Sequence, residues 1–323
     1  MSVQPYLSIS LASRCNLQCI YCPPRGESYG TSGTSFTVAD LKSVLQAGRA
    51  LGVSKVRFTG GETLLCRDIR EAVVLAEHHG MEILVATNGM HLEEHVHWLR
   101  EINGLVVKLS LDSLAPSLFR KITGGGRIER VLKGVESARN AGIKVRLNAV
   151  LTTLNAFSLD PLLRLCRSLG CGLKLLDMFP VPETERIWRS LYFPPEALGL
   201  TGTMRSPDPY SQHYGIPTDE LDIGGVHVRI KNSHKGTHYH PVCAGCKQFP
   251  CQEGFYCLVV TPPMTVLPCR LGRHLIRRCR GQGEVESALE ESFEVYNSSQ
   301  LANHFWSKYS GFYANRLAEL RRV

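Results

Sequence analysis

Short apolar runs alternate with longer amphipathic stretches throughout residues 7–178. The runs are rich in β-branched residues, which favour strands, and the stretches have the apolar spacing of helices. This alternation is typical of α/β proteins with a parallel sheet. The predicted strands are 7–11, 55–59, 82–87, 106–111, 144–151 and 173–178, and the predicted helices are 38–50, 67–79, 91–101, 127–140 and 159–169. We therefore expect an α/β fold, a partial (β/α)6 barrel of the TIM type.

Three cysteines, Cys15, Cys19 and Cys22, follow the first predicted strand with CxxxCxxC spacing. In a parallel sheet, the loops that follow strands lie at the carboxyl ends, where ligands bind. Three thiolates on one short loop suit three corners of a 4Fe-4S cluster and leave the fourth iron free to bind a small molecule. A structural zinc site is the alternative, but tetrahedral zinc takes four ligands and no fourth Cys or His lies nearby.

Polar residues follow the other predicted strands. Gly60, Gly61 and Glu62 come after the second strand, where glycines let the backbone approach a ligand closely. The polar residues at the ends of later strands are Thr87, Asn88, Ser110, Asp112, Ser113 and Asn148. We expect these groups to hydrogen-bond a ligand at the mouth of the barrel. The alternative for Asn88, Asp112 and Ser113 is helix N-capping.

Together these motifs resemble the radical S-adenosylmethionine (radical SAM) superfamily. The segments up to about residue 180 resemble the molybdenum cofactor biosynthesis protein A family, the GTP 3',8-cyclases, and the likeness extends to residues 119–124 and 175–181. The resemblance implies that the open iron binds SAM and that one electron from the cluster cleaves SAM to a 5'-deoxyadenosyl radical. The SAM-binding residues that it implies are Tyr21, Gly60, Gly61, Glu62, Thr87, Asn88, Ser110, Asp112 and Asn148.

A second group of cysteines resembles an auxiliary 4Fe-4S site, which gives two clusters and SAM as the expected cofactors. The predicted ligands are Cys243, Cys246, Cys251 and Cys269, with Cys257 as the alternative to Cys251. If Cys257 is not a ligand, it is a buried apolar residue or a hydrogen-atom donor to a substrate radical, and the second role would make it catalytic. A structural zinc site is again the alternative.

Two departures from the cyclases point to another reaction. Ser8 and the run Lys247-Gln248-Phe249 stand where the cyclases have arginines that bind triphosphate, and the chain ends without a Gly-Gly tail. We therefore predict hydrogen abstraction from a sugar, aminoglycoside or nucleoside in natural-product (antibiotic) biosynthesis, by epimerisation, dehydrogenation or decarboxylation. The alternatives are GTP 3',8-cyclase, a peptide-modifying radical SAM enzyme and a noncatalytic iron-sulfur carrier.

Composition limits the partners and the compartment. The 323 residues include 12 cysteines in clusters, with no secretory signal pattern, so we expect a reducing cytoplasm. No apolar run is long enough to span a membrane, and the basic residues are not interleaved with stacking aromatics, so we expect no membrane and no nucleic acid. The net charge of +8, with a basic group at residues 273–280, suits an anionic substrate or an acidic electron donor such as flavodoxin or ferredoxin.

The pattern along the chain predicts three parts. Residues 1–185 form the barrel, 186–283 a linker and auxiliary-cluster domain, and 284–323 a helical tail. Residues 180–217, rich in Pro, Gly and Ser, are interpreted as linker, and residues 227–279 as an irregular cysteine-rich segment. The loop 23–37 is a candidate lid over the site.

Overall fold

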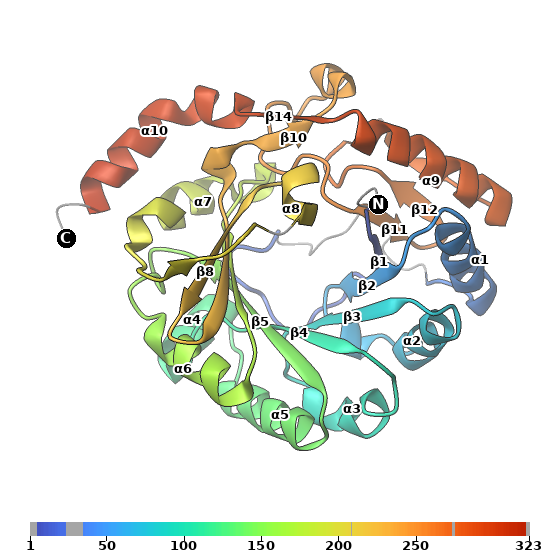
Figure 1. The fold of residues 1–323 in the computed structure, drawn as a ribbon, viewed down its shortest axis with the longest axis horizontal. Coiled ribbons are helices and arrows are strands. Elements are labelled where there is room, and N and C mark those ends of the chain that lie inside the picture. Colours follow the sequence, from blue (N-terminus) through green and yellow to red (C-terminus); the bar gives the residue numbers. More distant parts are fainter. Residues whose placement is uncertain (1–4, 24–34, 208, 273–274, 321–323) are drawn as a thin grey trace.

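The computed structural model describes residues 5–23, 35–207, 209–272 and 275–320, and its centre is a sheet of parallel strands. Six of these strands lie side by side in chain order and curve around a central space (Figure 1). They are β1 (Leu7–Ala12), β2 (Lys55–Gly60), β3 (Glu82–Thr87), β4 (Val106–Ser110), β5 (Lys144–Leu151) and β6 (Leu173–Asp177). The predicted α/β fold with a partial barrel is confirmed.

Helices cover the outer face of this sheet (Figure 1). They are α1 (Val38–Ala50), α2 (Ile69–His78), α3 (Leu92–Leu99), α4 (Pro116–Thr123), α5 (Ile128–Asn140) and α6 (Asp160–Leu169), with the short 3-10 turn η1 (Thr63–Leu65) before α2. Five of the six helices match the predicted ranges to within two residues. Helix α4 was not predicted; it begins with Pro116, ends at Thr123 and is followed by Gly124 in the left-handed region.

The two faces of the barrel strands differ in polarity. On β1, Leu7, Ile9 and Leu11 are buried in the apolar core under the helices. Ser8 and Ser10 point to the other face, because side chains alternate along a strand. The same alternation places polar and charged residues of the other strands inside the barrel, so its interior is polar.

The carboxy-terminal part of the chain extends the sheet at both edges. Strand β9 (Val226–Lys231) pairs parallel with β6, and β11 (Leu258–Thr261) pairs parallel with β1. Antiparallel strands complete the two edges: β8 (Thr218–Ile223) and β7 (Thr203–Met204) beyond β9, and β12 (Thr265–Leu267) and β13 (Arg277–Arg278) beyond β11. The predicted domain boundaries stay predictions, but the sheet continues across the one at residue 185.

Residues 180–217 are more than a linker. They contain α7 (Glu185–Leu191), α8 (Pro209–His213), strand β7 and the 3-10 turns η2 (Pro182–Thr184) and η3 (Pro195–Leu198). Trp188 on α7 is fully buried in an aromatic cluster with Phe305 and Trp306. This corrects the interpretation of the segment, because its large aromatic residues bury apolar surface that the Pro and Gly content does not reveal.

The segment 227–279 is also partly regular. Besides β9, β11, β12 and β13 it contains η4 (Ser233–Lys235), β10 (Thr237–Tyr239) and η5 (Pro241–Gly245). In the basic group, Arg277 and Arg278 lie on a strand, and Arg277 pairs with Glu291 at 3.2 Å. Arg273, His274 and residues 24–34 of the candidate lid lie outside the described residues.

Two helices close the chain. They are α9 (Gln282–Asn297), which packs on α1, and α10 (His304–Leu320), and β14 (Gln300–Ala302) between them pairs with β10 (Figure 1). Within the described ranges, no helix is both long and apolar enough to cross a bilayer.

Candidate active site

The cysteine loop lies at the carboxyl end of β1 and is held by the end of α4. The N–H groups of Gln18 and Ile20 donate to the carbonyls of Thr123 and Ile122 at 3.0 and 2.9 Å. Gly124 lies against the loop so closely that an added Cβ would be 2.6 Å from the Gln18 carbonyl oxygen. The segment 119–124, singled out for its resemblance, therefore supports the loop that carries the three cysteines.

Gly61 holds the other side of the same loop. The N–H of Glu62 donates to the Arg14 carbonyl at 2.8 Å, next to Cys15. A Cβ on Gly61 would lie 2.2 Å from that carbonyl oxygen, which is far inside van der Waals contact. Only glycine allows the end of β2 to approach the cysteine loop this closely.

The three thiols lie on one loop, an arrangement that suits an iron-sulfur cluster. Cys15 and Cys22 are exposed and Cys19 is half-buried, so all three stand near the surface of one loop. The N–H of Leu17 donates to Cys15 Sγ at 3.4 Å, the kind of contact that stabilises a thiolate. Over the parts of the chain that the structure describes, no three Cys, His, Asp or Glu side chains are already arranged around a metal position, so Cys15, Cys19 and Cys22 stay predicted ligands.

Glu62 is fully buried and its carboxylate joins the ends of β2 and β3. Its Oε1 accepts hydrogen bonds from the Leu64 N–H at 3.0 Å and the Thr87 hydroxyl at 2.6 Å, and its Oε2 accepts one from the Asn88 N–H at 2.7 Å. Burial raises the pKa of this carboxyl group. Glu62 thus positions the strand ends, and its contact with SAM stays a prediction.

Asn88 connects the end of β3 to the cysteine loop. Its Nδ2 donates to Asn16 Oδ1 at 2.8 Å and lies 3.8 Å from Cys15 Sγ. Its Oδ1 accepts from the Met90 N–H at 3.0 Å, and Ser113 Oγ accepts in the same way from the Ala115 N–H at 3.1 Å. Each of these two side chains therefore accepts from a backbone N–H two residues on, but neither caps a helix, since the N-cap residues of α3 and α4 are His91 and Ala115.

Asp112 is different, because it makes long-range contacts. Its Oδ2 accepts from the Tyr21 hydroxyl at 2.6 Å and its Oδ1 from the Val150 N–H at 2.7 Å. Burial raises the pKa of Asp112 to about 6, against the effect of these hydrogen bonds. Tyr21, Asp112 and the end of β5 are therefore brought together beside the cysteine loop, while Ser110 and Asn148 are register partners on β4 and β5.

The four cysteines predicted for the auxiliary cluster line one small apolar cavity. Cys243, Cys246, Cys251 and Cys269 surround it together with Val242, Phe249, Gly254, Phe255, Leu271, Gly272 and Leu275. A set of four thiols in an apolar surround fits an iron-sulfur cluster or zinc. Their role as ligands stays a prediction.

Cys257 lies elsewhere. It is buried with Tyr6, Val259 and Leu267, and its Sγ is 3.7 Å from Arg57 Nη2. It comes immediately before β11, whose Leu258 pairs with Leu7 at the start of β1. The structure therefore does not bring Cys257 together with the cysteine loop, the auxiliary cysteines or the predicted SAM residues.

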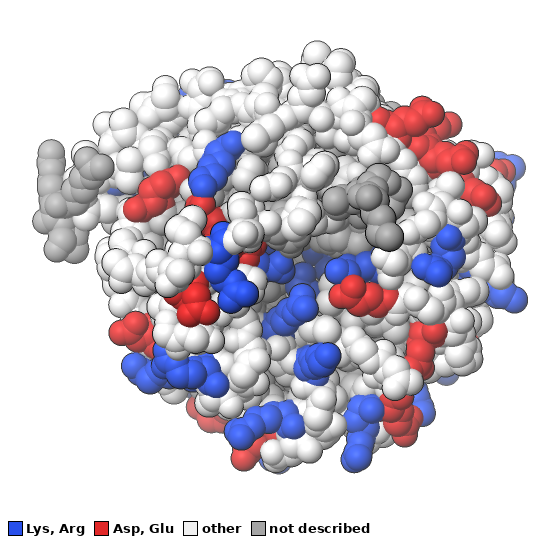
Figure 2. Space-filling model, viewed as in Figure 1, with Lys and Arg blue, Asp and Glu red and all other residues white. Residues whose placement is uncertain are grey.

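The interior of the barrel holds a cavity of about 520 Å³, a volume typical of small-molecule sites. Its amino-terminal end is formed by Pro5, Ser54 and Gly172, which precede strands, and the cavity extends inward to Asn148. The basic residues that line it are Lys55, Lys108, Arg146, Lys174, Arg229, Lys231 and His227. Among the described residues of its lining there is no Asp or Glu. Figure 2 shows Lys and Arg atoms inside this hollow.

Neighbouring strands place these cations next to one another. Lys108 on β4 pairs in register with Arg146 on β5, and Lys174 on β6 pairs with Arg229 on β9. Like charges at such positions repel, and an anion between them would relieve the repulsion. Burial, with Arg57, Lys174 and Arg229 nearby, lowers the pKa of Lys108 to about 7.

This cavity supplies basic side chains at positions other than the two that were compared with the cyclases. At the Ser8 position, Arg57 donates to the Ser8 hydroxyl from Nη2 at 2.8 Å and from Nε at 3.1 Å, so a guanidinium from the next strand lies there. Sequence analysis missed the interior cations. Their signal was the alternation of Lys and Arg with apolar residues in strands such as 55–58 and 228–231.

Comparison with known proteins agrees with this geometry. Residues 9–168, from β1 to α6, match the family model for the radical SAM superfamily. This segment is a radical SAM domain. It holds the cysteine loop and every residue predicted to contact SAM, and it is the kind of domain found in radical SAM enzymes.

The radical SAM domain is also the part shared with curated relatives. A GTP 3',8-cyclase of Bradyrhizobium diazoefficiens is 35% identical over 184 residues, which are 55% of this chain and 54% of that protein. A GTP 3',8-cyclase of Clostridium botulinum is 30% identical over 198 residues, 60% of this chain and 62% of that protein. The chain thus spans little more than half the length of these relatives, and they do not support a place in antibiotic biosynthesis.

Among solved structures, native anSMEcpe with bound AdoMet aligns over 98% of both chains with a TM-score of 0.57 and 16% identity. At this identity the likeness concerns the fold alone. It agrees with a parallel α/β sheet that continues beyond the radical SAM domain.

Proposed function

We propose that this chain is a radical SAM enzyme that abstracts a hydrogen atom from a phosphorylated small molecule held inside its barrel. The observation that carries the proposal is the basic cavity, whose described lining has seven basic side chains and no carboxylate; two of the seven, Lys55 and His227, pair with Glu82 and Glu220 behind the lining. Phosphate groups match such a lining, because guanidinium and ammonium groups bind phosphate oxygens with charge-assisted hydrogen bonds.

The charge of the cavity discriminates among the predicted substrates. An aminoglycoside carries ammonium groups, which Lys108, Arg146 and Lys174 would repel. A sugar phosphate or a nucleotide carries the opposite charge. GTP is the first compound to assay, because the relatives are named GTP 3',8-cyclase.

The residues around the mouth have defined tasks in this proposal. Cys15, Cys19 and Cys22 would hold the first cluster, which when loaded supplies the electron that splits SAM into methionine and the 5'-deoxyadenosyl radical. Gly61 and Gly124 keep the cysteine loop against β2 and α4. Glu62 fixes Thr87 and Asn88, and Asp112 fixes Tyr21, so that both strand ends present their polar groups to SAM.

The proposal also includes an auxiliary cluster and an electron donor. Cys243, Cys246, Cys251 and Cys269 would hold the auxiliary cluster, since all four line one cavity and Cys257 does not. A one-electron donor of the flavodoxin or ferredoxin type would reduce the first cluster. The reaction needs no nucleic acid and no membrane.

The test compares matched substrates. Anaerobically reconstituted protein is reduced with dithionite in the presence of SAM, and 5'-deoxyadenosine is quantified with GTP, guanosine, a sugar phosphate or an aminoglycoside. We expect a phosphorylated compound to increase 5'-deoxyadenosine formation and its unphosphorylated partner to leave the rate unchanged.

Two variants test whether the increase in 5'-deoxyadenosine formation depends on the basic cavity. Arg146→Met combined with Lys174→Met should abolish the increase but keep the substrate-independent cleavage of SAM. Arg139→Met, on the exposed surface of α5, is the matched control and should behave as the unaltered protein. A larger increase with the aminoglycoside than with any phosphorylated compound would refute the proposal.

A further inference from the structure

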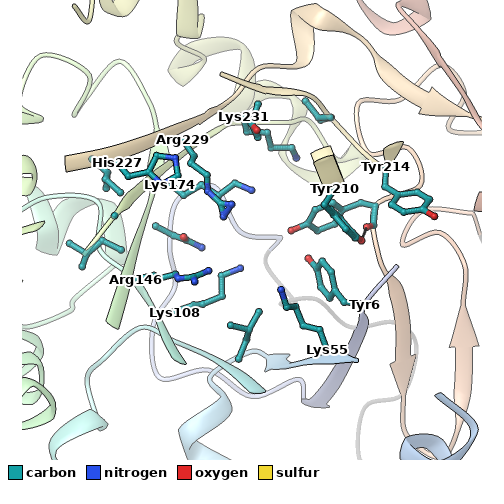
Figure 3. Close-up of a pocket in the computed structure, with 18 of the residues that line it drawn as sticks. Tyr6, Lys55, Lys108, Arg146, Lys174, Tyr210, Tyr214, His227, Arg229 and Lys231 are labelled. Atoms are coloured by element: carbon teal, nitrogen blue, oxygen red, sulfur yellow. Dashed lines mark hydrogen bonds between the residues drawn. The ribbon is translucent and has the colours of Figure 1, made fainter. Parts of the chain in front are cut away.

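One wall of the basic cavity is aromatic. Tyr6, Tyr210, Tyr214 and Tyr256 line it, and in Figure 3 the labelled Tyr6, Tyr210 and Tyr214 lie across the opening from Lys108, Arg146 and Lys174. The ring centroids of Tyr6 and Tyr210 are 5.3 Å apart, and those of Tyr210 and Tyr214 are 5.2 Å apart. We call Tyr6, Tyr210 and Tyr214 the tyrosine wall.

Two of the three hydroxyl groups of the tyrosine wall, those of Tyr210 and Tyr214, donate hydrogen bonds, whereas the Tyr6 hydroxyl is buried without a hydrogen-bond partner among the described residues. The Tyr210 hydroxyl donates to the Tyr256 carbonyl at 2.5 Å, and the Tyr214 hydroxyl donates to Asn297 Oδ1 at 3.0 Å. The Tyr210 ring is also packed between the rings of Tyr6 and Tyr214, so its orientation does not depend on the hydroxyl alone. Tyr210 remains half-buried rather than buried, so part of its ring is accessible from the cavity.

The position of the wall relative to the cations sets an order along the barrel. Tyr6 directly precedes β1, and Ser54 and Gly172 at the same end precede β2 and β6, so the wall lies at the amino-terminal end of the barrel. Lys108 and Arg146 follow further in, and Lys174 and Arg229 lie at the register of Asn148. The cavity reaches Asn148, which is level with Ser110 near the strand ends that carry the predicted SAM residues.

We infer that the tyrosine wall binds a planar ring at the far end of the substrate's phosphates, so that the substrate is a nucleoside diphosphate linked to a sugar. This inference rests on the proposed function. The nucleobase would stack on Tyr210 and Tyr6, the diphosphate would lie among the cations, and the sugar would face the SAM residues.

The dimensions of the barrel agree with this order. Gly60 lies six residue steps beyond Ser54, which corresponds to about 20 Å of extended strand. An extended nucleotide sugar is of comparable length. GTP bound with its guanosine toward SAM would instead place its terminal phosphate at the tyrosine wall, beside Lys55 but away from Lys108, Arg146, Lys174 and Arg229 (Figure 3).

Direct binding measurements separate the parts of the ligand. Isothermal titration of the full anaerobic protein would use pyrophosphate, UDP, UDP-glucose and GTP. We expect pyrophosphate to bind, and UDP to bind about tenfold tighter or more, the usual effect of one stacked base. The Tyr210→Leu variant should lose this gain and keep its affinity for pyrophosphate.

Two further variants control for structural damage. Tyr210→Phe keeps the ring but not the hydroxyl and should keep the gain with UDP, while Phe157→Leu removes an exposed aromatic ring outside the cavity and should change nothing. Equal affinities for UDP and pyrophosphate, or loss of the gain in Tyr210→Phe, would overturn the inference and leave the proposed function standing. Absence of pyrophosphate binding would refute the proposed function and this inference with it.

Discussion

The charge inside the basic cavity depends on pH through the side chain of Lys108. It lies on β4 beside Arg57, Arg146, Lys174 and Arg229, and burial among them lowers its pKa to about 7 from an ordinary value near 10.5. The unfolded chain therefore holds the proton more tightly than the folded protein between these two values. The free energy of unfolding should consequently increase as the pH rises through this window.

An anion in the cavity favours the charged form of Lys108. We therefore expect sulfate, whose charge is constant in this range, to bind about tenfold more weakly at about pH 8 than at about pH 6, because the protonated fraction of Lys108 falls by that factor. The increase in melting temperature with added sulfate measures this affinity.

Lys108→Met should bind sulfate more weakly at low pH and lose the pH dependence. Lys133→Met is the control, because Lys133 is an exposed lysine that pairs with Glu93. This variant should keep the pH dependence of sulfate binding. An unchanged pH dependence in Lys108→Met would show that another group titrates.

Individual residues differ in how well the sequence predicts them. Cys15, Cys19 and Cys22 were predictable because ligands on one loop show their spacing in the sequence. The contact of Tyr21 with Asp112 was not, since 91 residues separate them and only the packing of β4 against the cysteine loop joins them. Cys257 was predicted as an alternative cluster ligand or a hydrogen-atom donor. The pairing of β11 with β1 places it against Tyr6 and away from the auxiliary cysteines, and the donor role stays a prediction.

At the scale of elements, the buried Glu62 ties β2 to the end of β3 through hydrogen bonds from Thr87 and Asn88, and it accepts a third from Leu64 on η1. Glu62→Gln should lower the free energy of unfolding by about 1 to 3 kcal/mol, because the amide would turn an N–H2 group toward one of the three donors. Urea denaturation followed by circular dichroism measures the change.

Glu101→Gln provides the matched control. Glu101 pairs with Arg70 at 3.4 Å on the exposed surface, and loss of such a pair costs about 1 kcal/mol or less. Equal stability of the two variants would contradict the role given to Glu62.

The strands inside the barrel were predictable from their local sequence pattern, whereas the pairing of the strands at its edges was not. Strands such as β3 and β5 match their predicted ranges, because each has a continuous apolar or alternating run and a following helix. The partners of β9 and β11 could not be predicted, since a short strand far along the chain carries no local sign of the sheet edge that it joins. Helix α7 was missed because Pro and Gly flank its aromatic residues.

At the scale of the whole molecule, the sheet depends on both halves of the chain. A fragment of residues 1–185 would leave β1 without β11 and β6 without β9, and would expose the surface of α1 that packs on α9. We expect the fragment to lack a cooperative thermal transition in near-UV circular dichroism, in contrast to the full chain.

A fragment that melts cooperatively would instead support the boundary predicted at residue 185. The comparison needs the full chain under identical anaerobic conditions, so that loss of a cluster is not mistaken for loss of the sheet edges.

The cavity begins at the amino-terminal ends of the strands, whereas the cysteine loop stands at the opposite ends. A small molecule that enters through this amino-terminal end would reach the basic cavity without passing the cluster predicted at Cys15, Cys19 and Cys22. A substrate that enters there would approach the predicted SAM residues from the side opposite to the cysteine loop.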